Sequence, residues 1–357
     1  MRKKVLHVIN SLTIGGAETL LANSLSAGGL QQHTENYLVY FNQSSYLLDI
    51  IDKDVKVINL NYKGGFDIVR MLRQLKSIIK YNKIDIVHTH LTPASLYTHL
   101  VCPSAVPQVH TIHSTYSMDN ETRPWMRLLE RKLFLEKKKC NVISLSEFAK
   151  EDFLKKIPFK GKVFVLNNFV ADQFFLSPQK NTGHNAKKHR LLAVGSLKPL
   201  KNFEYLLDVF EHLKNEEIYL DIYGEGDKKL YEDIIKSKNL KVSMMGRNDD
   251  MVSVYPDYDL FIMPSKYEGF PLSLFEAMAS GIPLLLSDIA PLKSIVKNHA
   301  GYFSLDNAAA TADKISSIFK NRSATELIAN KAKQFATETV KREIYIKNLL
   351  AIYDNLK

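Results

Sequence analysis

Short apolar runs alternate with longer amphipathic stretches through the first half of the chain. Residues 66–81 have the spacing of a helix with one packed face, and five apolar runs read as buried strands: 3–10, 34–41, 55–60, 84–90 and 108–113. Strands that alternate with helices in this way form parallel sheets covered by helices. The first half therefore predicts a doubly wound parallel sheet.

The same pattern restarts after a polar segment. Residues 177–190, SPQKNTGHNAKKHR, are aperiodic and contain Pro and Gly, which is typical of a linker. A strand, a loop and a helix follow in RLLAVGSLKPLKNFEYLLDVF. We therefore expect an N-terminal domain over 1–176, a linker over 177–190 and a C-terminal domain over 191–339.

The densest pattern lies in PSKYEGFPLSLFEAMASGIPLLLSD, residues 264–288. It predicts a polar turn with Glu268 after a buried strand, then a helix with Pro271 in its first turn, then another buried strand. Glu276 follows Glu268 by eight residues, about two helical turns. Two carboxylates beside a helix N-terminus suit a ligand with a phosphate and several hydroxyls. The alternative is that both glutamates are solvated charges at a helix end.

The stretch EGFPLSLFEAMASGIPLLLSD resembles the E-x7-E signature of the retaining glycosyltransferases of family 4, which have the GT-B fold. This resemblance implies an α/β protein of two Rossmann-like, doubly wound parallel-sheet domains facing across a cleft. It also implies that a terminal helix at about 340–357 packs back on the first domain. The implied reaction moves a sugar from a nucleotide diphosphate sugar to a hydroxyl, with the anomeric configuration retained.

The resemblance assigns roles to residues around the helix start. Glu276 is expected to bind the ribose hydroxyls, and Glu268 to contact the donor sugar and stabilise positive charge at the anomeric carbon. The diphosphate is expected to meet Lys201 and backbone amides at the start of the helix. The remaining donor-binding residues expected there are Phe270, Pro271, Leu272 and Ser273.

Three other loops complete the expected donor site. Gly15 and Gly16 follow the first strand, where glycines let the backbone approach a ligand; a plain tight turn is the alternative. The loop before Lys201 is similar to the family's diphosphate loop, but Ser196 stands where the family has an arginine. Arg247 follows a strand near the place where family members seat the base.

Four histidines lie at the ends of two predicted strands: His88, His90, His110 and His113. No carboxylate completes a metal-ligand set there, so we expect cleft-facing or hydrogen-bonded imidazoles and no metal. The family resemblance selects His113 as a contact to the donor sugar. We expect no cofactor apart from the nucleotide sugar itself.

Charge is unevenly distributed along the 357 residues. Residues 1–170 hold 23 Lys and Arg against 14 Asp and Glu, a net +9, whereas 171–357 hold 25 against 24, a net +1. A basic first half favours an anionic partner. We expect a glycan or polyprenyl-phosphate-linked acceptor of surface polysaccharide synthesis and no nucleic acid.

Residues 123–139 are the most basic segment, with seven cations interleaved with apolar residues such as Trp125 and Leu128. They read either as a helix in peripheral contact with an anionic membrane or as a sheet-packing helix with a solvated basic face. Two cysteines form no disulfide framework, and no run reaches 18 apolar residues. We therefore expect a cytoplasmic protein, associated with the inner face of the membrane.

Two other functions compete with glycosyl transfer. A GT-B sugar-nucleotide epimerase would share the fold, and a phosphorylase would need a pyridoxal-phosphate lysine that nothing in the sequence marks. A non-catalytic protein that binds a sugar nucleotide or a membrane is the alternative from another class, and Ser196 is the feature that favours it.

Overall fold

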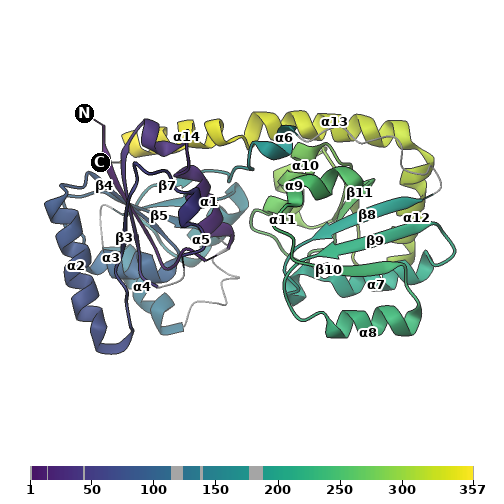
Figure 1. Cartoon of the computed structure of the whole chain (residues 1–357), viewed down its shortest axis with the longest axis horizontal. Helices are drawn as coiled ribbons and strands as arrows, with labels where there is room; N and C mark the ends of the chain where they lie inside the picture. The colour runs from purple at the N-terminus through teal and green to yellow at the C-terminus, as the bar shows by residue number, and fades with distance from the viewer. Residues whose placement is uncertain are drawn as a thin grey trace. The chain divides into compact units, whose positions relative to one another are not determined.

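The structure is a computed structural model that describes residues 2–13, 15–42, 45–113, 124–136, 140–176 and 188–356. The chain forms two compact units (Figure 1). Unit 1 comprises Met1–Phe169 with Arg342–Lys357, and unit 2 comprises Val170–Lys341. Each is a parallel sheet with helices, which confirms the predicted fold class of two Rossmann-like domains.

The sheet of unit 1 has seven parallel strands in the order β3-β2-β1-β4-β5-β6-β7. The apolar residues of the five inner strands are buried apart from Ile112, because helices cover a doubly wound sheet on both faces, whereas those of the two edge strands are partly exposed. The strands are β1 Lys4–Ile9, β2 Glu35–Tyr40, β3 Lys56–Asn59, β4 Ile86–His90, β5 Gln108–Ile112, β6 Cys140–Ser144 and β7 Val163–Val165.

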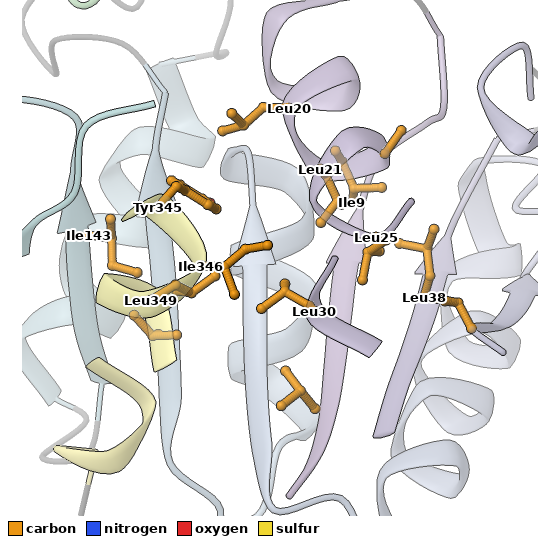
Figure 2. Packing of buried hydrophobic residues seen from close by; sticks show 14 of the residues in the cluster. Ile9, Leu20, Leu21, Leu25, Leu30, Leu38, Ile143, Tyr345, Ile346 and Leu349 are labelled. Atoms are coloured by element: carbon orange, nitrogen blue, oxygen red, sulfur yellow. The ribbon is translucent and has the colours of Figure 1, made fainter. Parts of the chain in front are cut away.

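One face of this sheet is covered by the two ends of the chain. Figure 2 shows Tyr345, Ile346 and Leu349 of the last helix near Ile143 of the sheet, and Leu21 and Leu25 near Ile9, all in one buried cluster. The last helix is therefore part of the core of unit 1. The α-helices of unit 1 are α1 Gly16–Ser24, α2 Ile68–Tyr81, α3 Thr92–Val101, α4 Pro124–Glu136, α5 Glu147–Lys156 and α14 Arg342–Asp354.

The sheet of unit 2 has six parallel strands in the order β10-β9-β8-β11-β12-β13. These are β8 His189–Val194, β9 Ile218–Tyr223, β10 Val242–Gly246, β11 Leu260–Met263, β12 Leu284–Ser287 and β13 Gly301–Phe303. The helices are α6 Gln173–Leu176, α7 Phe203–His212, α8 Lys229–Lys238, α9 Met251–Val254, α10 Leu272–Ser280, α11 Ala290–Val296, α12 Ala308–Lys320 and α13 Arg322–Thr339.

The expected domain boundary at residue 176 needs correction, because unit 1 ends at Phe169. The Val170 amide donates to the Val340 carbonyl at 2.9 Å, and the Phe174 ring lies edge-on to Tyr255, 5.6 Å between centroids. These contacts tie α6 to unit 2. The turn-forming pair Asn167-Asn168 lies just before this boundary, but the longer polar stretch at 177–190 has the stronger pattern of a linker.

The expected linker at 177–190 needs correction as well. Residues 177–187 lie outside the described part of the chain, but His189 and Arg190 already belong to β8. The carboxylate of Asp259, which precedes β11, accepts a hydrogen bond from the backbone amide of Arg190 at 2.9 Å and so helps to hold β8 in place. No helix in the described residues is long and apolar enough to cross a membrane.

Candidate active site

The two candidate glutamates lie on the predicted strand–loop–helix–strand unit of unit 2, formed by β11, α10 and β12. Gly281 ends α10 in the left-handed conformation, with φ 79°, which costs glycine little. In parallel sheets ligands bind at the carboxyl ends of strands, where helices begin. α10 is held in place by five buried side chains: Leu274, Phe275, Ala277, Met278 and Ala279.

The residues at the start of α10 differ in detail from the prediction. Pro271 precedes the helix instead of lying in its first turn, and Leu272 is the first helical residue. The ring of Phe270 stacks on Phe275, with centroids 4.5 Å apart and planes 9° from parallel. Phe270 therefore anchors the loop to the helix. The amides of Leu272 and Ser273 lie in the first turn, where no intrahelical acceptor is available to them.

Glu268 is buried and ion-paired. It is 6% exposed, its Oε1 lies 2.7 Å from Lys201 Nζ, and the Ser265 hydroxyl donates to the same oxygen at 2.6 Å. The alternative that Glu268 is a solvated charge at a helix end is therefore wrong. A buried carboxylate needs a cation and donors to offset its desolvation, and Lys201 and Ser265 supply them.

Lys201 reaches Glu268 because two loops are hydrogen-bonded to each other. The side-chain amide of Asn202 donates to the Pro264 carbonyl at 3.1 Å, and the Lys266 amide donates to the Leu200 carbonyl at 2.9 Å. Asn202 precedes α7 with φ 57° and makes no side-chain capping bond to that helix. Its side chain instead fixes the loop that carries Lys201 against the loop that carries Glu268.

Glu276 has a different environment, although it lies on the same unit. The Tyr255 hydroxyl lies 2.9 Å from Glu276 Oε2 and 3.0 Å from the Ser273 carbonyl. Burial raises the pKa of the Glu276 carboxyl to about 7, against the lowering effect of the Tyr255 hydrogen bond. Near neutral pH this carboxyl is poised between its two protonation states, and a ligand hydroxyl or cation shifts it toward the charged one.

Two further predicted residues lie at the ends of neighbouring strands. Ser196 follows β8 and is half-buried, and the Ser273 hydroxyl donates to the Val194 carbonyl at the end of the same strand, at 3.2 Å. Arg247 follows β10 and pairs with Asp249 at 2.8 Å on the surface. The geometry therefore places Ser196 near the start of α10, whereas Arg247 is held by its own loop.

In unit 1 the expected glycines lie at the carboxyl end of β1. Gly15 caps α1 with extended backbone, φ −145°, and a Cβ on Gly16 would meet nothing within 4 Å. The fold itself therefore does not require a glycine at position 16. Open space beside the first turn of α1 leaves room for a ligand at its free amides.

His113 follows β5 and belongs to a group of imidazoles. Its Nε2 lies 3.2 Å from Nδ1 of His90, which is 1% exposed on β4. Burial lowers the pKa of His113 to about 4 and that of His90 well below its ordinary value. Both rings are therefore neutral at pH 7, and their mutual contact restricts the tautomer that each can adopt.

His7, His88 and His90 form the group of nitrogen ligands that is compact enough for a metal within the described residues, all within 4.8 Å of one another. Both nitrogens of His88 are already engaged at 2.7 Å, by the hydroxyls of Tyr353 and Thr111. A metal would have to displace one of these partners. The expected absence of a metal stays a prediction.

Each half of the chain matches a different family model. Residues 177–335 match the glycosyl transferases of group 1, and residues 14–174 match glycosyltransferase family 4. The chain belongs to these glycosyltransferases. The buried Lys201–Glu268 pair and the Tyr255–Glu276 pair are thus features of a glycosyltransferase domain.

This glycosyltransferase is similar to several curated and solved proteins. It is 26% identical over 306 residues to the putative glycosyltransferase EpsF of Bacillus subtilis, covering 80% of this chain and 79% of that protein. It is 27% identical over 328 residues to an Escherichia coli UDP-Gal:alpha-D-GlcNAc-diphosphoundecaprenol alpha-1,3-galactosyltransferase, covering 85% and 84%. The crystal structure of Anabaena Alr3699/HepE in complex with UDP and glucose superposes with a TM-score of 0.81, at 15% identity over 99% of this chain and 100% of that one.

Sequence reasoning missed four residues of this glycosyltransferase that support the candidate site. Ser265 contacts Glu268 and Tyr255 contacts Glu276, and nothing in the sequence around this serine and this tyrosine predicts these contacts. His7 pairs in register with His88 on the neighbouring strand, and a histidine within an apolar strand was a usable signal. His90 was expected only as one of four cleft-facing or hydrogen-bonded imidazoles, and its contact to His113 was missed because it depends on β4 and β5 being adjacent.

Proposed function

We propose that this glycosyltransferase moves a sugar from a uridine diphosphate sugar to a hydroxyl of a lipid-linked glycan, with retention of the anomeric configuration. The uridine nucleotide is supported by HepE, solved with UDP and glucose, and by the E. coli relative named for UDP-Gal. The lipid-linked acceptor is supported by the same relative, named for a diphosphoundecaprenol substrate. Assembly of a surface polysaccharide is the process that fits this acceptor.

The observation that carries the proposal is the buried contact between Lys201 and Glu268 beside the start of α10. Lys201 and the amides of Leu272 and Ser273 bind the diphosphate and stabilise its charge as it departs. Glu268, held at a fixed position by Ser265, contacts the donor sugar and stabilises positive charge at the anomeric carbon. Ser196 lies in the same loop as Lys201 and supplies a hydroxyl where the family has a cation.

The proposed step exchanges one bond at the anomeric carbon for another. The bond from that carbon to the diphosphate oxygen breaks, and a bond to the acceptor oxygen forms on the same face of the sugar. The acceptor proton passes to the departing diphosphate. The positive charge for this step comes from Lys201 and the helix amides, so we expect the reaction to continue in EDTA.

Other residues bind the rest of the donor. Glu276 accepts hydrogen bonds from the ribose hydroxyls, and Tyr255 holds its carboxyl in place. Arg247 contributes weakly near the base. In unit 1, His113 offers a neutral imidazole to a sugar hydroxyl, and Gly15 with Gly16 leaves space beside the first turn of α1.

A peripheral contact with an anionic membrane through 123–139 would bring the enzyme to its acceptor. Within the described part of this segment, Trp125 is 56% exposed and Leu128 is 71% exposed. Arg131 and Lys132 are also exposed, so aromatic, aliphatic and cationic groups share one face. Arg123 and residues 137–139 of the segment lie outside the described residues. A cytoplasmic location at the inner membrane face would follow.

A thermal-shift panel tests the donor pocket. UDP, GDP, ADP and dTDP sugars are compared with and without EDTA, because a ligand that binds the native state raises the melting temperature by mass action. We expect stabilisation by UDP sugars in both conditions. Stabilisation by another nucleotide would contradict the uridine assignment, and no shift from any sugar nucleotide would favour the non-catalytic alternative. Interconversion of one UDP sugar into its epimer would favour the epimerase.

A further inference from the structure

Helix α2 carries only positive charge on the outside of unit 1 (Figure 1). Its sequence, IVRMLRQLKSIIKY, has two arginines, two lysines and no carboxylate. Like charges three and four residues apart on a helix repel one another, so this arrangement does not stabilise the isolated helix. An anionic surface against α2 would remove that repulsion.

The inner side of α2 fixes which residues point outward. Met71 and Leu75 are fully buried and Ile79 is 2% exposed, in the cluster that also contains Leu6 and Val87 of the sheet. Helical geometry then places the residues between them on the opposite side. The apolar face of α2 is already used inside unit 1, so any partner of α2 meets its outer side.

The outer side presents a line of unpaired cations: Arg73, Lys76 and Lys80, called the cation line below. All three side chains are exposed, and none forms an ion pair or a side-chain hydrogen bond with the described residues. Val69, 50% exposed, continues the line toward the start of the helix. Arg70 does not belong to it, because its guanidinium is bonded to Asp67.

An exposed aromatic side chain precedes the cation line in the sequence. Phe66 is 100% exposed and lies in the short 3-10 turn Gly65–Asp67 before α2. Arg70 Nε and Nη2 donate to the two oxygens of Asp67 at 2.6 and 2.7 Å, and the Lys63 amide donates to Asp67 at 2.9 Å. These bonds fix the backbone that presents Phe66. A fully exposed phenylalanine on a fixed turn has unfavourable hydration that only a partner can relieve.

We propose that the cation line docks unit 1 on an anionic lipid bilayer, with Phe66 inserted at the headgroup level. Juxtamembrane lysines and arginines are attracted by the negative surface potential of anionic lipids, and an aromatic ring favours the interface. This surface is additional to the contact expected through 123–139. It concerns where the enzyme works and does not depend on which donor it uses.

The chemistry of α2 favours a bilayer over a protein or nucleic-acid partner. Phe66 and Val69 are single apolar residues, too little area for the packed centre of a stable protein interface. A nucleic acid would satisfy the cations, but the side chain of Val69 offers it neither a hydrogen bond nor a stacking surface. A fluid anionic surface accepts the cations and the exposed apolar groups together.

Vesicle binding tests the cation line directly. The full-length protein is sedimented with phosphatidylcholine vesicles, with or without phosphatidylglycerol, and no donor is added. We expect binding only with the anionic lipid and weakening by salt. Because each cation near such a surface contributes about 1 kcal/mol, the triple variant Arg73→Gln, Lys76→Gln, Lys80→Gln should bind roughly a hundredfold more weakly.

The matched control neutralises three exposed lysines of unit 2, by Lys229→Gln, Lys236→Gln and Lys331→Gln. It lowers the net charge equally and should bind nearly as well as the wild type. Equal loss in both triple variants would show attraction by net charge alone and overturn the proposal. So would an unchanged affinity of the α2 variant, absence of binding by the wild type, or tighter binding to duplex DNA at the same salt.

Tryptophan fluorescence distinguishes membrane contact by the turn before α2 from membrane contact by α4. Trp125, on α4, is the only tryptophan of the chain, so it reports on that helix alone. In a Trp125→Phe background, Phe66→Trp places the only indole on the α2 turn. We expect the emission of this variant to shift to the blue with anionic vesicles, as its indole leaves water. Binding without any shift at position 66 would overturn the insertion of this turn.

Discussion

The two units of the protein share a fold but gather opposite kinds of chemistry at the carboxyl ends of their strands. Unit 2 brings together charged groups, with Lys201 and Glu268 in a buried contact of 2.7 Å. Unit 1 brings together imidazoles such as His90 and His113, whose pKa values are lowered by burial so that they stay neutral. Fixed charges suit a diphosphate leaving group, and neutral donors and acceptors suit sugar hydroxyls.

The comparison of the two units also distinguishes side chains that stabilise the fold from side chains whose placement is better explained by function. The charges of unit 2 hold two loops together even without a ligand, so changes there affect both folding and turnover. Among the buried histidine nitrogens of unit 1, Nε2 of His90 has no hydrogen-bond partner in the described residues. Such groups destabilise a fold, and their retention is consistent with a role at the site.

The largest effect is expected from Glu268→Gln. It removes the charge that is proposed to face the anomeric carbon, and loss of one such electrostatic contact lowers turnover by about a hundredfold or more. It also leaves Lys201 without its carboxylate, which should lower the free energy of unfolding by about 2 kcal/mol, less than for a fully buried pair. Turnover of a UDP sugar and urea unfolding measure the two effects.

The double variant Lys201→Gln, Glu268→Gln is the control for that change. Two neutral amides of similar size can bond to each other, so stability should return close to that of the wild type while turnover stays low. Recovery of turnover together with stability would show that the pair is structural and would contradict its catalytic assignment.

Acid should destabilise unit 1 before it affects unit 2. Burial lowers the pKa of His7 from 6.5 to about 4, so the unfolded chain binds protons first as the pH falls. The contribution of neutral His7 to the free energy of unfolding is fully present above pH 6.5 and is lost as the pH falls toward 4. This loss is on the order of 3 kcal/mol from His7 alone. Urea unfolding followed by Trp125, which lies in unit 1, measures this loss. His7→Phe should reduce it, whereas the exposed His33→Asn should leave it unchanged.

The pH dependence of Glu276 has the opposite sign. Its pKa is raised from 4.5 to about 7, so the folded state holds its proton more tightly and stability falls as the pH rises between these values. Glu276→Gln should remove this pH dependence of the free energy of unfolding, which amounts to at most about 3 kcal/mol. It should also weaken UDP binding roughly tenfold, because the carboxylate acceptor is lost. A steeper loss of stability with rising pH in the variant would contradict the assignment. Calorimetric UDP titrations at pH 6 and 8 check the binding effect.

The smallest effect is expected from Arg247→Ala. Its guanidinium is partly exposed and bonded to Asp249, which is itself 83% exposed, so its removal should change stability by less than about 0.5 kcal/mol. The KM for the donor should rise only several-fold. A rise beyond a hundredfold would move Arg247 into the centre of the donor site.

The sequence predicted the fold and the central unit well because both follow from local pattern. Alternating apolar runs gave the two parallel sheets, and the spacing around Glu268 and Glu276 gave the strand–loop–helix–strand unit. The burial of Glu268 could not be predicted, because it depends on the Asn202 side chain bonding to Pro264 across two loops. The boundary at Phe169 likewise depends on contacts made by residues distant in sequence.

The side-chain partners of the site residues could not be predicted from the sequence for the same reason. Tyr255 meets Glu276 and His90 meets His113 only after strands and helices far apart in the sequence become neighbours. Residue type alone does not distinguish a tyrosine that positions a carboxylate from one that fills a core. The pattern of the sequence therefore locates such a site, but the side-chain contacts within it can be known only from the structure.

Calorimetric titration of UDP in EDTA tests the central claim most directly, with the wild type and the double variant Lys201→Gln, Glu268→Gln. If the buried pair marks the donor diphosphate site, the wild type binds one UDP per chain and the equally stable variant binds at least tenfold more weakly, because its lysine charge is gone. Equal affinity of the two proteins, or no binding by the wild type, would contradict the claim.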